Sequence, residues 1–370
     1  MDDRDYMELA LSLAAKGRGQ VSPNPMVGAV VVRDRKIVGS GYHTLAGIKH
    51  AEVLAFEEAG EQTRDATLYV TLEPCSHQGR TPPCADAVIA AGIKRAVAAI
   101  EDPNPLVAGR GFEKLRAAGI EVEIGLCASE AAYLNEKFIT FQRNRRPFVH
   151  LKVAQSLDGR IATRTKASKW ITGSEARQAV QELRYEYDAI LVGIGTVLAD
   201  NPDLTIRLDK PRARPLTRIV IDERLQLPTD SRLAQSAKET PVIVFTLSDY
   251  TKKTEELTRS GVAVIRTVAK GQKIDLQAAL AELAKREITS VIVEGGSETN
   301  GRFVSERLVD KYTFFIAPKV IGGREAPGPI GGEGIAVLDE ALLFESFNFR
   351  VVGQDIEITA YPLREKKLEE

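Results

Sequence analysis

Two short stretches in the first hundred residues carry side chains that could bind a metal ion and hydrolyse a bond. His50 is followed by Glu52, and Cys75 and Cys84 come later, Cys75 directly after a proline. A tetrahedral zinc ion with three protein ligands keeps its fourth position for water and lowers the pKa of that water from about 15.7 towards about 7. We therefore predict that His50, Cys75 and Cys84 bind Zn²⁺ and that Glu52 transfers protons during hydrolysis.

The order H-x-E followed by P-C-x-x-C is the signature of zinc-dependent deaminases, but eight residues rather than two separate the cysteines here. A structural zinc site is the alternative. Such sites normally have four protein ligands, and His77 is the only nearby candidate for a fourth, which favours the catalytic interpretation. Polar residues of the surrounding loops could contact a substrate, although each could equally stabilise its own turn. These candidates are Asn24, His43, His77, Arg80, Asp102 and Asn104.

Composition limits the classes of protein that the chain can belong to. With 370 residues, 44% of them apolar, the chain is long enough for two domains. A net charge of −1 favours neither nucleic acid nor a membrane surface as a partner. Three cysteines, an acidic amino terminus without the features of a signal peptide, and no long apolar run indicate a cytoplasmic protein.

Apolar periodicity predicts two successive α/β domains, of residues 1–146 and 147–370. In the first, a hairpin near residues 27–38 and strands at 67–71, 95–100 and 121–124 alternate with helices at 50–59, 84–91, 109–118 and 129–141. This alternation indicates an α/β/α layered domain with helices on both faces of the sheet. In the second, apolar runs at 148–154, 189–192, 218–221, 242–245, 262–265 and 291–293 indicate a mostly parallel sheet.

Two glycine-containing strand ends lie in the second domain. Gly193 and Gly195 follow a strand, but no third glycine completes a Rossmann fingerprint. Glu294 is followed by Gly295, Gly296 and a predicted helix. Glycines at this position let backbone N–H groups approach a phosphate at the start of the helix.

The ten residues from Cys75 to Cys84, CSHQGRTPPC, resemble the deaminase half of the bifunctional riboflavin-biosynthesis enzymes, and the second half of the chain resembles their reductase half. The resemblance implies a cytidine-deaminase-like α/β/α domain followed by a dihydrofolate-reductase-like α/β domain. It also implies zinc-dependent deamination of 2,5-diamino-6-ribosylamino-4(3H)-pyrimidinone 5′-phosphate. NADPH-dependent reduction of the ribosyl group to ribityl would then give 5-amino-6-(5-phosphoribitylamino)uracil. A homo-oligomer is plausible for this family.

The same resemblance implies the residues of the reductase site. Those that would contact NADPH are Ala154, Trp170, Thr196, Asp200, Asp222, Gly296, Ser297, Glu298, Thr299, Asn300, Gly301 and Arg302. Those that would hold the phosphorylated substrate are Ser168, Arg184, Leu204, Arg207 and Glu294. Guanidinium groups such as those of Arg184 and Arg207 bind phosphate bidentately. Lys152 and Asp200 are both candidates for proton transfer, and no motif names the residue that reads the 2′-phosphate of NADPH.

Two alternatives stay open at this point. A nucleic-acid or nucleoside deaminase with an unrelated second domain would need a basic and aromatic surface, which the balanced charge does not favour. A zinc-stabilised binding module without activity would contain zinc but release no ammonia from a pyrimidine.

Overall fold

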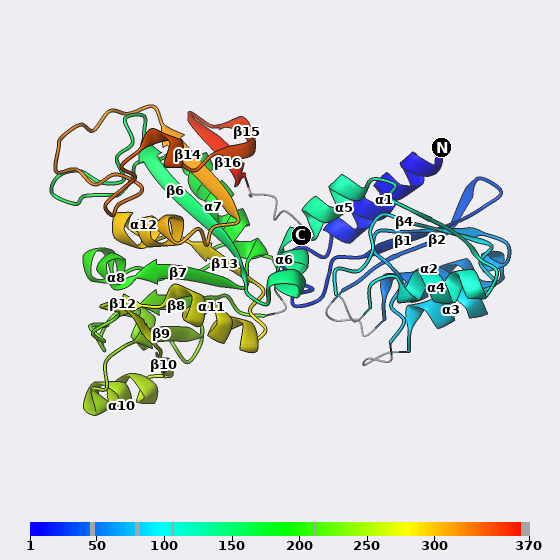
Figure 1. Cartoon of the computed structure of the whole chain (residues 1–370), viewed down its shortest axis with the longest axis horizontal. Helices are drawn as coiled ribbons and strands as arrows, with labels where there is room; N and C mark the ends of the chain where they lie inside the picture. The colour runs from blue at the N-terminus through cyan, green and yellow to red at the C-terminus, as the bar shows by residue number, and fades with distance from the viewer. Residues whose placement is uncertain (45–48, 78–81, 105–106, 211, 213, 364–370) are drawn as a thin grey trace. The chain divides into compact units, whose positions relative to one another are not determined.

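The computed structural model describes residues 1–44, 49–77, 82–104, 107–210, 212 and 214–363. The chain forms two compact units, one holding residues 1–146 and one that begins at Pro147 (Figure 1). Within the described residues, no helix is long and apolar enough to cross a membrane.

The first unit is built on a five-stranded sheet with the order β2-β1-β3-β4-β5. The strands β1 and β2 are antiparallel, β3 pairs antiparallel with β1, and β4 and β5 continue parallel to β3. Their bounds are β1 Gly28–Arg33, β2 Lys36–Tyr42, β3 Thr67–Val70, β4 Arg95–Ala98 and β5 Glu121–Ile124. The predicted hairpin and the three strands that follow it are therefore present.

Alternate residues of these strands pack under two layers of helices. Val31 belongs to a core with α2, α3 and α4, whereas Val30 and Val32 belong to a core with α1 and α5. The helices span α1 Asp3–Ala15, α2 Ala51–Ala59, α3 Cys84–Ala90, α4 Arg110–Ala117, α5 Ala128–Leu134 and α6 Glu136–Asn144. The predicted α/β/α layering of this domain is confirmed.

Helix α2 lies unusually close to strand β2. A Cβ atom at Gly39 would come within 2.1 Å of the carbonyl oxygen of Ala55, and one at Gly41 within 2.4 Å of that of Ala51. Only glycine permits this approach of helix and strand. The contact fixes the start of α2, where His50 and Glu52 lie.

The single helix predicted over residues 129–141 is instead two helices, α5 and α6, divided at Asn135. The Asn135 side chain is buried, accepts a hydrogen bond from the backbone N–H of Met26 (2.8 Å) and donates one to the Met26 carbonyl (2.9 Å). Because this contact joins segments 109 residues apart, the apolar periodicity of residues 129–141 could not predict it.

The second unit contains a nine-stranded sheet with the order β10-β9-β8-β7-β13-β6-β14-β16-β15. The first seven strands in this order are parallel, and β16 and β15 complete the sheet in antiparallel orientation. The parallel strands span β6 Phe148–Ser156, β7 Ala189–Gly193, β8 Thr217–Ile221, β9 Val242–Thr246, β10 Val262–Arg266, β13 Ser290–Val293 and β14 Lys311–Ala317. The antiparallel strands span β15 Phe344–Val352 and β16 Asp355–Pro362, and a small hairpin of β11 Ala269–Lys270 and β12 Lys273–Ile274 lies apart.

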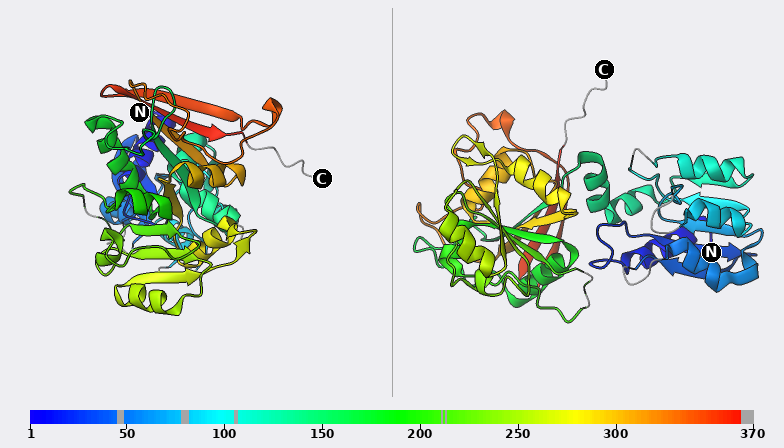
Figure 2. Two further views of the ribbon diagram at one scale, coloured as in Figure 1. Left: turned by 90° about the vertical axis from the view of Figure 1, so that its left-hand side faces the viewer. Right: turned by 90° about the horizontal axis from the view of Figure 1, so that it is seen from below.

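Helices lie on both faces of this sheet (Figure 2). Leu151 and Leu191 pack with α11 and α12 on one face, and Ile190 and Val192 pack with α8, α9 and α10 on the other. The helices span α7 Ser174–Glu186, α8 Ile194–Asp200, α9 Arg232–Gln235, α10 Thr251–Arg259, α11 Leu276–Lys285 and α12 Ser297–Ser305. The carboxyl ends of the parallel strands thus meet at one edge, where ligands bind in open α/β sheets.

Candidate active sites

The first candidate site brings His50, Cys75 and Cys84 together. The Nδ1 atom of His50 lies 2.9 Å from the Sγ atom of Cys84 and 3.7 Å from that of Cys75. All three ligand atoms lie within 4.8 Å of one another. Tetrahedral zinc with Zn–N of about 2.0 Å and Zn–S of about 2.3 Å requires ligand atoms roughly 3.5 Å apart. One imidazole and two thiols at this spacing fit zinc with one position left open.

Secondary structure explains why these three residues meet. His50 is the N-cap residue of α2, Cys84 is the first residue of α3, and Cys75 lies in the loop after β3. The positive ends of two helices therefore face the site, which favours thiolate ligands.

The side chains of the two cysteines interact with each other. The Cys84 thiol donates a hydrogen bond to Cys75, which also accepts one from the backbone N–H of Cys84 (3.2 Å). These bonds lower the pKa of Cys75 to about 4 and raise that of Cys84. The lowered pKa of Cys75 favours its thiolate form, and a bound cation would displace the remaining thiol proton.

Glu52 lies in the first turn of α2 with 3% of its surface exposed. Burial raises the pKa of its carboxyl group, although a hydrogen bond with Cys84 opposes the shift. A carboxylate that takes up a proton more readily than usual, next to a metal ligand, suits a group that accepts and returns protons.

Four of the predicted loop residues lie around these ligands. The His43 ring meets the His50 ring edge-on at 5.6 Å, and its Nε2 atom lies 3.3 Å from Nδ2 of Asn24. Burial lowers the pKa of His43, which keeps its imidazole neutral. Asp102 interacts electrostatically with His77 and Cys75, and burial raises its pKa.

Two further predictions concern the same loops. The backbone N–H of Asn104 donates a hydrogen bond to the Asp102 carboxylate (2.8 Å), which stabilises the turn between them. The substrate contact of Asn104 stays a prediction. The prediction for Arg80 lies outside the described residues.

Sequence analysis missed Glu73, which organises the cysteine loop. This residue is 3% exposed, and its carboxylate accepts hydrogen bonds from the backbone N–H groups of Asp102 (3.0 Å), Gly109 (3.0 Å) and Gly111 (2.8 Å). A Cβ atom at Gly111 would come within 2.1 Å of the carbonyl oxygen of Pro74, so only glycine lets the two loops approach this closely. Glu73 thereby joins the loop that carries Cys75 to the loop that carries Asp102. An acidic residue at the end of a buried strand was the available signal, because such a group requires donors.

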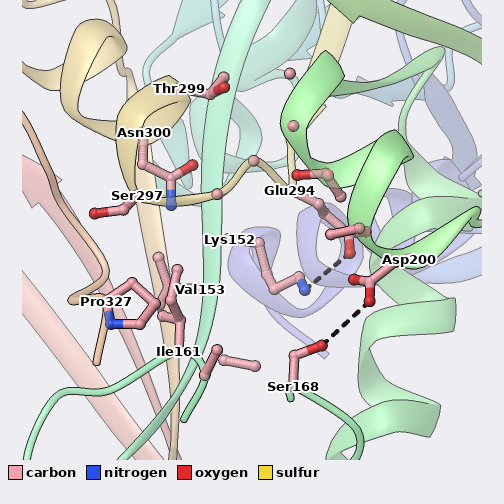
Figure 3. A pocket seen from close by; sticks show the side chains of 18 of the residues that line it. Lys152, Val153, Ile161, Ser168, Asp200, Glu294, Ser297, Thr299, Asn300 and Pro327 are labelled. Carbon is pink, nitrogen blue, oxygen red and sulfur yellow. Dashed lines mark hydrogen bonds and ion pairs between the residues drawn. The ribbon is translucent and has the colours of Figure 1, made fainter. Parts of the chain in front are cut away.

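The second candidate site is a cavity of about 1030 Å³ at the carboxyl ends of β6, β13, β7 and β8 (Figure 3). It gathers most of the residues predicted for the reductase. Those that line it are Lys152, Ala154, Ser168, Trp170, Arg184, Thr196, Asp200, Arg207, Glu294, Gly296, Ser297, Glu298, Thr299, Asn300 and Arg302.

A buried ion group lies in the middle of this cavity. Glu294 binds Arg184 through both carboxylate oxygens (2.7 and 3.0 Å) and Lys152 at 2.8 Å. Burial alone would raise the pKa of Glu294, but the two cations hold it far below its usual range. Arg184 also donates to the carbonyl of Thr205 (3.0 Å). Ser168 donates to Asp200 at 3.5 Å nearby. Figure 3 shows this hydrogen bond and the ion pair between Lys152 and Glu294.

Three predicted contacts do not line the cavity. Asp222 is fully buried and accepts a hydrogen bond from the backbone N–H of Leu227, which holds a turn. Leu204 is buried in the core on the α9 and α10 face. Gly301 faces Gly331, whose carbonyl oxygen would lie 2.0 Å from a Cβ atom.

The cavity also contains polar residues that sequence analysis missed. Arg177 and Gln181 precede Arg184 on α7 at helical spacing, which was a usable signal. The guanidinium of Arg177 lies 4.9 Å from the ring centre of Trp170, which is 60% exposed and therefore not a core aromatic. Other missed lining residues are Lys166, Lys169, Gln178, Glu223, Arg224, Gln226, Gln272 and Lys273.

Comparisons with known proteins found a matching family for each of the two units. Residues 1–100 match the family described as the cytidine and deoxycytidylate deaminase zinc-binding region, and residues 147–358 match the RibD C-terminal domain family. The riboflavin biosynthesis protein RibD of Aquifex aeolicus is 47% identical over 96% of this chain and 97% of its own length. The RibD of Escherichia coli is 43% identical over 96% of this chain and 98% of its own length.

Solved structures give the same result. Acinetobacter baumannii RibD, form 1, is similar with a TM-score of 0.88 and 39% identity, covering 98% of this chain and 99% of its own. A Thermotoga maritima diaminohydroxyphosphoribosylaminopyrimidine deaminase/5-amino-6-(5-phosphoribosylamino)uracil reductase has a TM-score of 0.84 and 38% identity, covering 97% and 98%. These likenesses confirm the predicted order of a deaminase-like and a reductase-like domain, and they exclude an unrelated second domain.

Replacing Glu73 with glutamine should loosen the loop that holds Cys75. The amide keeps the size of the side chain but loses the charge that strengthens three hydrogen bonds. We expect the amides of Asp102, Gly109 and Gly111 to exchange with deuterium about 30-fold faster, corresponding to roughly 2 kcal/mol. Hydrogen–deuterium exchange with mass spectrometry measures this, with the exposed Glu61→Gln as control. Equal exchange in both variants would show that Glu73 does not hold the loop.

Proposed function

The chain belongs to the RibD family of riboflavin-biosynthesis proteins, and from this premise we propose which of its residues perform the two reactions of the family. The protein is a bifunctional enzyme with a deaminase unit and a reductase unit. The family matches imply a zinc ion in the first unit and a nucleotide cofactor in the second. Small-molecule pyrimidines are its class of substrate. The cytoplasmic location stays a prediction.

We assign deamination of 2,5-diamino-6-ribosylamino-4(3H)-pyrimidinone 5′-phosphate to the first site. His50, Cys75 and Cys84 would hold zinc, and the observation that carries this assignment is the convergence of their three ligand atoms. Bound there, zinc supplies hydroxide at neutral pH. In the net reaction, water adds to the carbon that bears the 2-amino group, the C–N bond breaks, and ammonia leaves. Glu52 would accept the proton of the water and return it to the leaving nitrogen.

We assign reduction of the ribosyl chain to the cavity of the second unit. NADPH, the proposed cofactor, supplies a hydride to C1′ of the ring-opened sugar imine. Backbone N–H groups at the start of α12, after Gly295 and Gly296, would bind its phosphates. The observation that carries this assignment is that one cavity contains most of the predicted cofactor residues and most of the predicted substrate residues.

Lys152 is the better placed of the two candidates for delivering the proton that the imine nitrogen requires. Its ammonium group has three N–H donors, and the ion pair with Glu294 at 2.8 Å fixes its position. Asp200 accepts from Ser168 and lies 3.9 Å from the Lys169 amine, which suits it to orient polar groups of the ligands. We therefore give Lys152 the proton transfer and Asp200 a binding role.

A homo-oligomer is the proposed assembly, and strand β15 is its proposed contact surface. This strand forms one edge of the nine-stranded sheet. Phe347, Phe349 and Val351 are 68%, 70% and 73% exposed along it. An exposed apolar edge strand readily pairs with another chain, because its backbone N–H and C=O groups lack partners on that side.

Replacing Glu52 with glutamine should abolish deamination but not zinc binding, because the amide cannot accept the proton. A loss of about 10²-fold or more is expected for a general acid–base group. Ammonia release and zinc content of the purified protein measure the two properties. Glu57→Gln, on the exposed side of the same helix, is the control, and Cys75→Ser should lose the metal itself. Near-normal ammonia release by the Glu52 variant would exclude this role.

Replacing Lys152 with glutamine should lower kcat of the reductase by about 10²-fold or more, as expected for loss of a general acid. Asp200→Asn should act mainly on KM, because it removes a binding contact. Ammonia release should stay unchanged in both variants. Steady-state oxidation of NADPH with the deaminated ribotide measures kcat and KM. A larger fall in kcat for the Asp200 variant would reverse the assignment of the two residues.

Replacing Phe349 with aspartate should dissociate the proposed oligomer, because a charge would then lie in the apolar contact. Sedimentation velocity of the full-length chain measures the change. Tyr133→Asp, an equally drastic change of an exposed aromatic side chain in the first unit, is the control. An unchanged sedimentation coefficient for the Phe349 variant, or a monomeric native protein, would exclude β15 as the contact.

A further inference from the structure

One end of the reductase cavity is bounded by the residues that follow β8 and by the β11–β12 hairpin. Glu223, Arg224 and Gln226 line it from the first segment, and Gln272 and Lys273 line it from the second.

Most of the charges at this end already have partners. Glu223 pairs with Arg302 at 2.8 Å, and Arg302 also donates to the carbonyl of Ile274. Lys273 pairs with Glu298. Arg224 differs from them, because its exposed guanidinium has no partner among the described residues. This end of the cavity therefore carries one uncompensated positive charge.

The order of strands indicates which part of a dinucleotide lies there. The sheet runs β8-β7-β13-β6 along the edge where the cavity lies. Gly295 and Gly296, at the end of β13, offer the phosphate-binding backbone, and Lys152 and Ala154, on β6, lie on the side of the reduction chemistry. A cofactor whose nicotinamide faces β6 and whose pyrophosphate lies at β13 must extend its adenosine half past β7 towards β8. Arg224 lies three residues beyond the end of β8 and lines the cavity there.

We propose that Arg224 binds the 2′-phosphate on the adenosine ribose and makes the reductase prefer NADPH to NADH; the proposal rests on the reductase function assigned to this cavity. A guanidinium fork binds phosphate bidentately. In Rossmann-type folds, which this domain does not have, a carboxylate binds the ribose 2′-hydroxyl of NADH and an arginine accommodates the 2′-phosphate of NADPH. The same chemistry distinguishes the two cofactors in any fold, because a guanidinium attracts the phosphate and a carboxylate repels it. Here the Asp222 side chain is fully buried beneath its own turn and Glu223 is paired with Arg302, so neither carboxylate is presented to a ribose hydroxyl.

The test compares both cofactors with the full-length protein and its Arg224→Gln variant. The kcat/KM for NADPH should fall about 30-fold or more, as expected for loss of charged hydrogen bonds, and mainly through KM. The kcat/KM for NADH should change less than about twofold, because NADH lacks the phosphate. Binding of 2′,5′-ADP should weaken to the level of 5′-AMP in calorimetry. Arg224→Lys, which keeps the charge without the fork, should retain part of the preference.

Arg324→Gln is the matched control, since this exposed arginine does not line the cavity. An equal loss with both cofactors, or an unchanged preference for NADPH, would overturn the role of Arg224. A loss of preference in Lys273→Gln but not in Arg224→Gln would overturn it as well and assign the phosphate to the hairpin. Failure of the native protein to oxidise either cofactor would instead refute the reductase assignment itself.

Discussion

Both sites depend on a carboxylate that follows a buried strand and cannot reach water. Glu73 follows β3 and meets three backbone N–H groups, whereas Glu294 follows β13 and meets the side chains of Lys152 and Arg184. A buried charge without donors is strongly unfavourable, so each carboxylate fixes the segments that supply them. In the first unit the donors lie between Asp102 and Gly111, beside the loop that carries Cys75. In the second unit they are on helix α7 and strand β6, which carry Arg184 and Lys152.

Close packing of helix α2 on strand β2 positions His50, one of the three predicted zinc ligands. Helix α2 can start beside Cys75 and Cys84 only because Gly39 and Gly41 let it lie directly on β2. His50 then caps the helix and Glu52 points from its first turn into a dry environment, which raises its pKa. The close packing that positions His50 therefore also raises the pKa of Glu52.

Predictions from the sequence agree with the structure where they depend on residues close together in the chain. The apolar runs predicted the strands, and the motifs around His50, Cys75 and Cys84 named three side chains whose ligand atoms lie within 4.8 Å of one another. Asp222 was matched to the cofactor by its place after a strand; its side chain holds a turn, and its contact with NADPH stays a prediction. The features that the sequence did not predict depend on distant segments, as where Asn135 divides a helix through its contact with Met26. Arg224 was unpredictable for the same reason, since its free charge is apparent only once Glu223 is seen to pair with Arg302, 79 residues away.

The contacts of the buried ion group distinguish Arg184 from Arg207, the two arginines that were predicted to bind the substrate phosphate. Arg184 uses Nε and Nη2 on Glu294 and Nη1 on the Thr205 carbonyl, so its fork is already engaged by the protein. Arg207 keeps a side chain that is 65% exposed and only a distant contact with Asp203 at 3.9 Å. Because the Thr205 carbonyl lies two residues before Arg207, Arg184 holds the segment that presents Arg207. We therefore propose that Arg184 positions the phosphate site and that Arg207 binds the phosphate.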